Sequence, residues 1–317
     1  MDKEEYLGVA VLIPCYNESL TISSVVRQFK DTLPGALIYV FDNNSTDNTG
    51  SLAKLEGAIV RKVYLRGKGN VVRRMFADVQ AEIYVLVDGD DTYSVKSSPE
   101  MIRRLIHDGL DMVLASRVAN NEMLHRFGHR IGNILLTRAM AFIFGRFFSD
   151  MLSGYRVFSR RFVKSFPAYS KGFETETELT IHALQLRMPV AEISTPYASR
   201  PVGSFSKLNT FQDGIKILVT IFNMFKDEKP LYFFSLAFSF CIIAALILIY
   251  PVFITYFNTG LVPRFPTLIT SSALILLGFI FLACGIVIDV VTRGRNELKR
   301  FMYLSVSPLN TCPSIER

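Results

Sequence analysis

Cysteine is scarce in this sequence, and no cysteine stands in a metal-binding or disulfide pattern. The four cysteines of the 317-residue chain are scattered, without a Cys-x-x-Cys pair. This spacing excludes a zinc finger and a small disulfide-stapled fold, and it favours a reducing compartment. The first residues, MDKEEYLGV, are too charged for a signal peptide, so we expect the segment that follows them to stay in the cytosol.

Charged residues are absent from two long stretches near the C-terminal end. The first runs from Pro230 to Pro263 and the second from Phe265 to Ile288, with Arg264 alone between them. As helices they would be ~51 Å and ~36 Å long, against a hydrocarbon core of ~30 Å. A buried core helix would account for one such stretch, but two in succession predict two membrane-spanning helices.

Positive charge flanks both stretches. Lys226 and Lys229 precede the first, and the second is followed by Arg293, Arg295, Lys299 and Arg300. The positive-inside rule therefore predicts a hairpin in the cytoplasmic (inner) membrane, with both termini cytoplasmic. Attraction to anionic lipid headgroups accounts for the net charge of +7. No zinc-finger spacing or aromatic RNA-binding signature supports a nucleic-acid partner.

The first two hundred residues alternate short apolar runs with helical patterns. The apolar runs predict buried strands at Val9–Ile13, Leu37–Phe41, Ile83–Val87 and Asp111–Ala115. After the first strand, helical spacing predicts one buried face formed by Leu20, Val25, Val26 and Phe29. This alternation predicts an α/β fold with a mostly parallel sheet covered on both faces.

Polar residues cluster where three of these strands end. The clusters lie at Pro14–Glu18, Asp42–Thr49 and Asp88–Asp91. Because the carboxyl ends of parallel strands meet at one edge of a sheet, we expect the clusters to form one ligand site. A dinucleotide-binding or P-loop site is excluded, since Arg66-Gly-Lys-Gly69 has neither of the glycine spacings that those sites need.

Asp88 and Asp90 stand one residue apart directly after a buried strand. Carboxylates are hard oxygen ligands of the kind that hold Mg²⁺ or Mn²⁺ and leave coordination positions open for phosphate oxygens. An acidic turn is often only solvated, and the sequence leaves open whether Asp91 is solvated or has a role in the site. The two other polar loops nearby favour a Mg²⁺ or Mn²⁺ site at Asp88 and Asp90.

These motifs resemble a known family. The runs Ile13-Pro-Cys-Tyr-Asn-Glu18 and Asp42-Asn-Asn-Ser-Thr-Asp47, together with Asp88-Gly-Asp90, are similar to family 2 glycosyltransferases of the GT-A fold. The second half of the chain resembles one branch of this family, the polyprenyl-phosphate glycosyltransferases, which include dolichol-phosphate mannose synthase and the bactoprenol glucosyltransferases. The residues that carry this resemblance are Ala115–Arg117, Asp150–Arg156, Glu178, Glu192 and Arg200–Lys207. The resemblance covers roughly residues 8 to 230. The chain departs from it at Asn43, where Asp is commoner, and at Thr92, where some relatives carry a metal-proximal Gln.

The resemblance implies an inverting transfer of a sugar from a nucleotide diphosphate to undecaprenyl or dolichyl monophosphate at the cytoplasmic membrane face. A UDP-sugar is favoured as donor, GDP-mannose also fits, and the sequence leaves a homo-oligomer open. The donor contacts that it implies are Pro14, Tyr16, Asn17, Glu18, Asp42, Asn44, Ser45, Lys68, Asp88, Gly89 and Asp90.

A phosphate acceptor is already an anion, so it needs cations to position it more than it needs a general base. The candidate catalytic residues are therefore Asp88, Asp90, Arg117, Arg130, Arg200 and Lys207. Arg126 and His129 compete with Arg130 for the acceptor phosphate. Asp150 and Glu178 are expected to hold a sugar hydroxyl or to partner Arg156, and a role as general base is the less favoured alternative.

The chain is expected to divide into four segments. They are a GT-A catalytic domain (1–210), a juxtamembrane amphipathic helix (211–229), two transmembrane helices (230–292) and a cytoplasmic tail (293–317). The apolar stretches Ile134–Phe148 and Gln212–Phe225 suit interfacial helices as well as core helices.

The sequence bears on three rival functions. Processive polysaccharide synthases resemble one another in a QxxRW motif. This chain contains no Trp, so it lacks that motif. A glycosyltransferase with a hydroxyl lipid acceptor, such as ceramide or diacylglycerol, stays open. A non-catalytic nucleotide-sugar-binding scaffold is disfavoured by the Asp88–Asp90 pair and by the cations of Arg200–Lys207.

Overall fold

The computed structural model describes residues 6, 8–119, 138, 148–172, 174–198, 219, 222–223 and 225–308. The chain divides into two compact units. The first comprises Met1–Ile217 with Leu298–Arg317, and the second comprises Leu218–Glu297. The amphipathic stretches expected at 134–148 and 212–225 lie for the most part outside the described residues.

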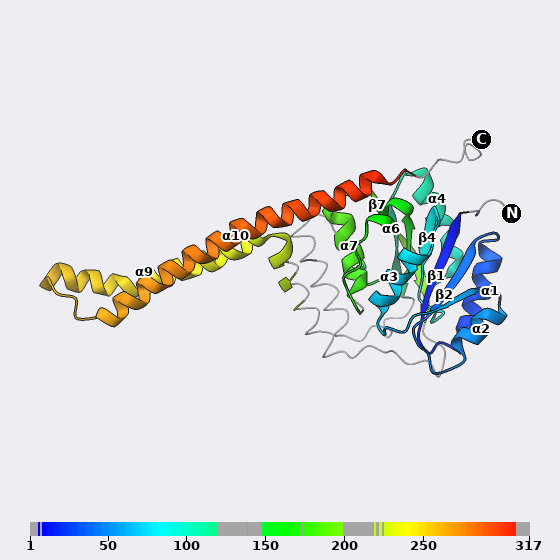
Figure 1. Ribbon diagram of the computed structural model, residues 1–317, viewed down its shortest axis with the longest axis horizontal. Helices are drawn as coiled ribbons and strands as arrows, with labels where there is room; N and C mark the ends of the chain where they lie inside the picture. The colour runs from blue at the N-terminus through cyan, green and yellow to red at the C-terminus, as the bar shows by residue number, and fades with distance from the viewer. Residues whose placement is uncertain are drawn as a thin grey trace. The chain divides into compact units, whose positions relative to one another are not determined.

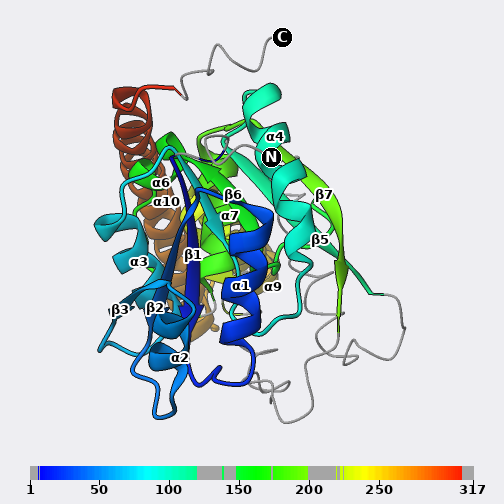
Figure 2. The same cartoon turned by 90° about the vertical axis from the view of Figure 1, so that its right-hand side faces the viewer.

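The first unit is built on a seven-stranded sheet with the order β3-β2-β1-β4-β6-β5-β7 (Figures 1 and 2). Four predicted strands are confirmed as β1 (Val9–Cys15), β2 (Leu37–Asp42), β4 (Ile83–Leu86) and β5 (Met112–Ala119). Three further strands were not predicted from the sequence: β3 (Ile59–Lys62), β6 (Arg156–Ser159) and β7 (Val190–Tyr197). The pairing is parallel except at β6, which is antiparallel to both β4 and β5. The sheet is therefore mixed but mostly parallel.

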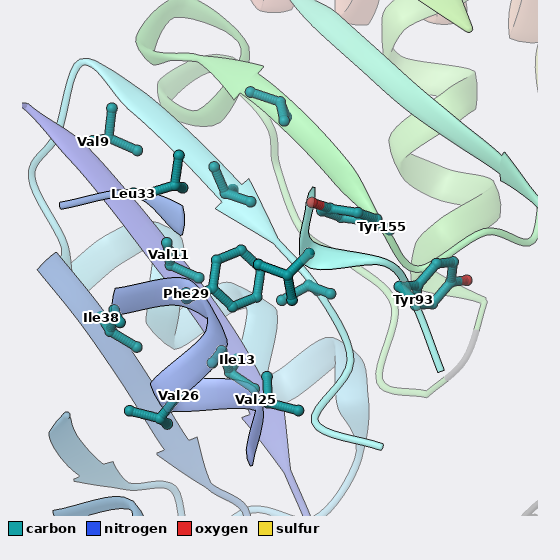
Figure 3. Close-up of a cluster of buried hydrophobic side chains, with 14 of the residues drawn as sticks. Val9, Val11, Ile13, Val25, Val26, Phe29, Leu33, Ile38, Tyr93 and Tyr155 are labelled. Atoms are coloured by element: carbon teal, nitrogen blue, oxygen red, sulfur yellow. The ribbon is translucent and has the colours of Figure 1, made fainter. Parts of the chain in front are cut away.

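Helices cover both faces of this sheet. They are α1 (Ile22–Thr32), α2 (Thr49–Leu55), α3 (Lys68–Asp78), α4 (Ser98–His107), α6 (Arg160–Ser165) and α7 (Thr175–Gln185), with a short 3₁₀ turn η1 (Val95–Ser97). On one face the alternate residues Val9, Val11 and Ile13 of β1 pack against Val25 and Phe29 of α1 (Figure 3). This alternation is the period of two that a strand imposes on its side chains.

One residue of the predicted helix face is wrong. Leu20 precedes α1 and its side chain is 66% exposed, whereas Ile22 is buried at the start of the helix. The helical period places Ile22, Val25, Val26 and Phe29 together on the inner face, so Ile22 takes the position that the sequence analysis gave to Leu20.

The second unit contains most of two long apolar helices, α9 (Pro230–Thr259) and α10 (Phe265–Ser305). Their most apolar windows have mean hydropathies of 2.6 and 2.9, with only 17% and 11% of each window buried. A core helix of a soluble protein would instead be mostly buried. By length, composition and exposure both helices are suited to cross a membrane.

Small residues line the face of α10 that packs on α9. The buried residues Ser271, Gly278, Gly285 and Thr292 recur every seven positions. A Cβ atom added at Gly285 would lie 2.8 Å from the Cβ of Phe234 on α9. Small residues of this kind let membrane helices approach closely.

α10 continues well beyond the end of the apolar run at Ile288, and its last turns belong to the first unit. There the Tyr303 hydroxyl donates to Asp111 Oδ2 at 2.8 Å, and Arg161 Nε donates to the carbonyl of Val306 at 2.7 Å. The segment that follows the second apolar stretch is thus helical through Ser305, and its end is hydrogen-bonded to Asp111, just before β5, and to Arg161 of α6.

Candidate active site

The loops that follow β1 and β2 are joined by hydrogen bonds. The backbone N–H of Asn17 donates to Ser45 Oγ at 3.0 Å, and Asn17 Oδ1 accepts from the N–H of Thr46 at 2.8 Å. The N–H of Glu18 donates to Thr49 Oγ1 at 2.9 Å. Asn17 and Ser45 therefore hold the two loops together, with Asn17 in the left-handed region at φ 53°.

The third polar loop, after β4, joins the same site. Thr21 Oγ1 donates to the carbonyl of Gly89 at 2.6 Å. A Cβ atom at Gly89 would lie only 2.7 Å from Cys15 Sγ, so any larger residue at position 89 would force the buried Cys15 to shift. The structure brings the three predicted polar clusters together at one edge of the sheet.

Asp42 and Tyr16 lie on the β1–β2 side of this edge. Asp42 is buried, and its Oδ1 accepts the N–H of Ser45 at 2.9 Å. Of the other predicted donor contacts here, Pro14 is partly buried and Asn44 is exposed. The guanidinium of Arg66 lies over the ring of Tyr16 at 5.1 Å.

Asn43 ties β2 to the segment that leads to α3. Its Nδ2 donates to the carbonyls of Val63 at 3.0 Å and Leu65 at 2.7 Å, and its Oδ1 accepts the N–H of Gly67 at 2.8 Å. An aspartate has no donor for the two carbonyls. The departure from the commoner Asp at this position thus has a structural reason.

The carboxylates of the Asp88–Asp91 turn have distinct environments. Asp90 is 4% exposed, and its Oδ1 accepts from Thr92 Oγ1 at 2.6 Å. Asp91, at φ 56°, accepts from Gln28 Nε2 of α1 at 2.9 Å. Asp91, whose role the sequence left open, is partly buried and fixes the turn to α1.

Lys68 occupies the centre of a buried charge cluster. Its Nζ lies 2.5 Å from Asp88 Oδ1 and 2.5 Å from Glu176 Oε1. Burial opposes the charge of the ammonium, but attraction to the two carboxylates outweighs it and raises the pKa of Lys68 above its ordinary value. Lys68 thus remains a cation beside a candidate metal ligand.

Lys68 lies between two glycines that allow the chain to pass close to a neighbouring backbone segment. Cβ atoms at Gly67 and Gly69 would each come within 2.1 Å of a backbone carbonyl oxygen, that of Lys171 and of Ser170 respectively. Glu178 holds this neighbouring segment, since its carboxylate accepts the N–H of Ser170 at 2.9 Å and that of Tyr169 at 2.7 Å. The expectation that Glu178 partners Arg156 is therefore wrong.

Glu176 was not predicted from the sequence. It lies in the first turn of α7 and is 5% exposed, and among the described residues its buried second oxygen, Oε2, has no hydrogen-bond partner. Glu174, Glu176 and Glu178 alternate in the sequence. On a helix, residues four apart share a face, so Glu176 points away from the other two. That phase is the only signal that sets it apart.

Arg117 pairs with Asp150 at the far side of the site. Its Nε donates to Asp150 Oδ2 at 2.5 Å, and its Nη2 donates to Asp150 Oδ1 at 2.8 Å. The guanidinium also lies 5.5 Å from the ring centre of Tyr197. Burial opposes the charge of Arg117, but the hydrogen bonds to Asp150 outweigh it and raise its pKa. Glu192 accepts the N–H of Ser149 at 2.9 Å, next to Asp150.

Arg156 is fully buried and organises the loop before β6. It donates to the carbonyls of Met151 at 2.7 Å and Ser153 at 3.0 Å, and to Thr180 Oγ1 at 2.8 Å. Burial lowers its pKa to about 10, which leaves it charged at neutral pH. The same loop reaches the charge cluster, since a Cβ atom at Gly154 would fall within 2.4 Å of Asp88 Oδ2.

The residues present suit a hard divalent cation in part. Among the described residues there is no group of three His, Cys, Asp or Glu side chains arranged to hold a metal. Asp88 and Asp90 supply two carboxylates, so phosphate oxygens and water would have to complete the coordination of Mg²⁺ or Mn²⁺. The candidate cations Arg130, Arg200 and Lys207, and the alternatives Arg126 and His129, lie outside the described residues.

Comparisons with known proteins agree with this geometry. A family model described as Glycosyl transferase family 2 matches residues 10–166. Glycosyltransferase AglJ of Haloferax volcanii is 35% identical over 72% of this chain and 75% of that protein. The dolichyl-phosphate hexose transferase of the same organism is 28% identical over 72% of this chain and 99% of that protein.

A solved structure shares the fold. Glucosyl-3-phosphoglycerate synthase from Mycobacterium tuberculosis, in complex with Mn²⁺, uridine diphosphate and glucosyl-3-phosphoglycerate, matches with a TM-score of 0.56. Its sequence is 22% identical, and the match covers 69% of this chain and 81% of that chain. The match confirms the predicted GT-A fold.

Proposed function

Because the chain belongs to glycosyl transferase family 2, we propose that it transfers a sugar from a nucleotide diphosphate to a polyprenyl monophosphate. The observation that carries the proposal is the joining of three strand-end loops around Asp88 and Asp90, in a chain that also has two exposed apolar helices. The likeness to a dolichyl-phosphate hexose transferase supports a lipid phosphate as acceptor.

The donor would bind at the joined loops. Tyr16, Glu18 and Asp42 are proposed to contact the base and ribose, since a carboxylate accepts hydrogen bonds from ribose hydroxyls. Asn17 and Ser45 use their side chains to hold the loops together, so we assign them positioning roles. A UDP-sugar is the favoured donor, and GDP-mannose is the alternative.

The leaving diphosphate would meet a divalent cation at Asp88 and Asp90. Mg²⁺ or Mn²⁺ supplies a Lewis acid that stabilises the charge developing on the leaving oxygen. Thr92 orients Asp90 through the 2.6 Å bond to Oδ1. Lys68 adds a fixed positive charge next to Asp88.

The acceptor phosphate would attack as an anion, with inversion at the anomeric carbon, and no carboxylate need remove a proton. Arg117, Arg130, Arg200 and Lys207 are the proposed acceptor cations. Arg117 gives two of its guanidinium hydrogen bonds to Asp150, which leaves other N–H donors for a phosphate. The pair with Asp150 offsets its charge, so we expect the remaining cations to contribute more.

The membrane would present the acceptor to this site. We propose that α9 and α10 cross the cytoplasmic membrane as a hairpin, with the catalytic unit and both termini in the cytoplasm. The Lys and Arg residues that flank the apolar stretches support this orientation.

A panel assay tests the proposal. The full-length protein in lipid nanodiscs is incubated with UDP-glucose, UDP-N-acetylglucosamine, UDP-galactose or GDP-mannose and with undecaprenyl phosphate, ceramide or diacylglycerol. We expect product on undecaprenyl phosphate with one donor. Product on ceramide or diacylglycerol alone would establish the hydroxyl-acceptor alternative instead.

A further inference from the structure

Glu176 shares the ammonium of Lys68 with a candidate metal ligand. The Lys68 Nζ lies 2.5 Å from Glu176 Oε1 and 2.5 Å from Asp88 Oδ1, and it is largely buried between them. The segment that carries Lys68 has little room to move, because Gly67 and Gly69 pack directly on backbone carbonyls. The backbone that carries Lys68 is therefore held in place beside Asp88.

The charges of this cluster match those of a divalent cation. Asp88, Asp90 and Glu176 contribute three negative charges against the single positive charge of Lys68, which leaves two negative charges. If Glu176 were neutral, Asp88 alone would balance Lys68, and the ammonium would repel a cation bound at Asp88 and Asp90. Glu176 is therefore the residue that makes a lysine compatible with a metal at this position.

The second oxygen of Glu176 supports this role. No described residue gives a hydrogen bond to the buried Oε2, which is costly and calls for an explanation in a native structure. Glu178, on the same helix, uses both its oxygens to hold backbone N–H groups. Of these two glutamates of α7, Glu176 is the one that directs its charge at the Lys68 ammonium.

We propose that Glu176 is a positioning residue for the divalent cation, and that it acts by neutralising Lys68 so that Asp88 stays available to the metal. The inference rests on the proposed metal-assisted transfer. It predicts that Glu176 affects cation affinity, and that this effect depends on Lys68.

The test measures Mn²⁺ binding by electron paramagnetic resonance, on the full-length protein in detergent, with UDP kept at a saturating concentration for every variant so that a change in nucleotide affinity does not alter the result. Glu176→Gln should weaken Mn²⁺ binding about tenfold. Adding Lys68→Met to this variant removes the unbalanced ammonium and should restore the affinity to within about threefold of wild type. Glu174→Gln, which removes the same charge from the same end of α7, is the matched control and should bind like wild type.

The outcomes separate the two proposals. Wild-type protein that binds no Mn²⁺ would overturn the metal-assisted transfer and this inference together. Wild-type binding with equal affinity in Glu176→Gln, or no recovery in the double variant, would overturn only the role of Glu176. Should Glu176→Gln fail to fold, Lys68→Met is compared with the double variant. Equal Mn²⁺ affinities are then expected, and a further loss in the double variant would show that Glu176 does not act through Lys68.

Discussion

Asn43 accepts the backbone N–H of Gly67 at 2.8 Å, and through this bond the end of β2 holds the turn that delivers Lys68. The same side chain donates to two backbone carbonyls, so it uses its donors and its acceptor at once. The geometry of the charge cluster around Lys68 thus depends on a residue that need not touch any ligand.

Asn43→Asp should loosen this turn. The carboxylate would face the carbonyls of Val63 and Leu65 without a donor, at a cost of about 1–3 kcal/mol. We expect a lower free energy of unfolding and weaker binding of a UDP-sugar, measured by denaturation and calorimetry. Asn48→Asp makes the same chemical change at an exposed position whose side chain caps no backbone N–H, and it should not lower the free energy of unfolding. Unchanged stability of Asn43→Asp would contradict the role given to these hydrogen bonds.

His182 should make the catalytic unit sensitive to acid. It is buried against Phe162 and Phe166, and burial together with the nearby charge of Lys299 lowers its pKa to about 3. At a pH below the unfolded-state pKa of about 6.5, this histidine binds a proton in the unfolded chain but stays unprotonated in the folded chain. The free energy of unfolding should therefore fall by about 1.4 kcal/mol per pH unit from this group as the pH drops from 6.5 towards 3.

The measurement is denaturant unfolding of the full-length protein in detergent across this pH range. In His182→Asn, the slope of the free energy of unfolding against pH should decrease by the equivalent of one proton. His107→Asn, at an exposed site on α4, serves as the matched control. A slope that is the same in wild type and His182→Asn would show that His182 does not titrate in this way.

Gly285→Leu should separate the two apolar helices. A Cβ atom there already comes within 2.8 Å of Phe234, so a larger side chain would overpack the interface at a cost of about 1–3 kcal/mol. We expect a lower melting temperature in detergent. A Cβ atom at Gly294 meets nothing within 4 Å, so Gly294→Leu provides the control. Equal melting temperatures for both variants would contradict the close packing.

The sequence predicted the elements that bury continuous apolar runs. β1, β2, β4 and β5 are confirmed because their cores are apolar, and the polar clusters at their ends meet as parallel strands require. The missed strands lack that signal. β3 has four residues, none of them buried, β6 is equally short and begins with Arg156, and only one residue of β7 is buried.

The parts of the site that the sequence could not predict depend on tertiary contacts. Arg66-Gly-Lys-Gly69 matched no known glycine spacing. Its two glycines are needed because the backbone carbonyls of residues 170–171, about a hundred positions away in the sequence, pack directly against them. Glu176 depends in the same way on α3 and α7 coming together around Lys68. Likewise the charged stretch after Ile288 stays helical to Ser305, where Tyr303 meets Asp111.

The central claim is that sugar passes to a polyprenyl phosphate with the help of a cation held by Asp90. It is tested most directly by following labelled sugar from the nucleotide sugar into an acid-labile lipid product, with undecaprenyl phosphate and Mn²⁺, for wild type and Asp90→Ala. Loss of the charged ligand should slow transfer by at least about a hundredfold, while the protein remains folded. Undiminished transfer by Asp90→Ala, or label that never enters undecaprenyl phosphate with any donor of the panel, would contradict the account.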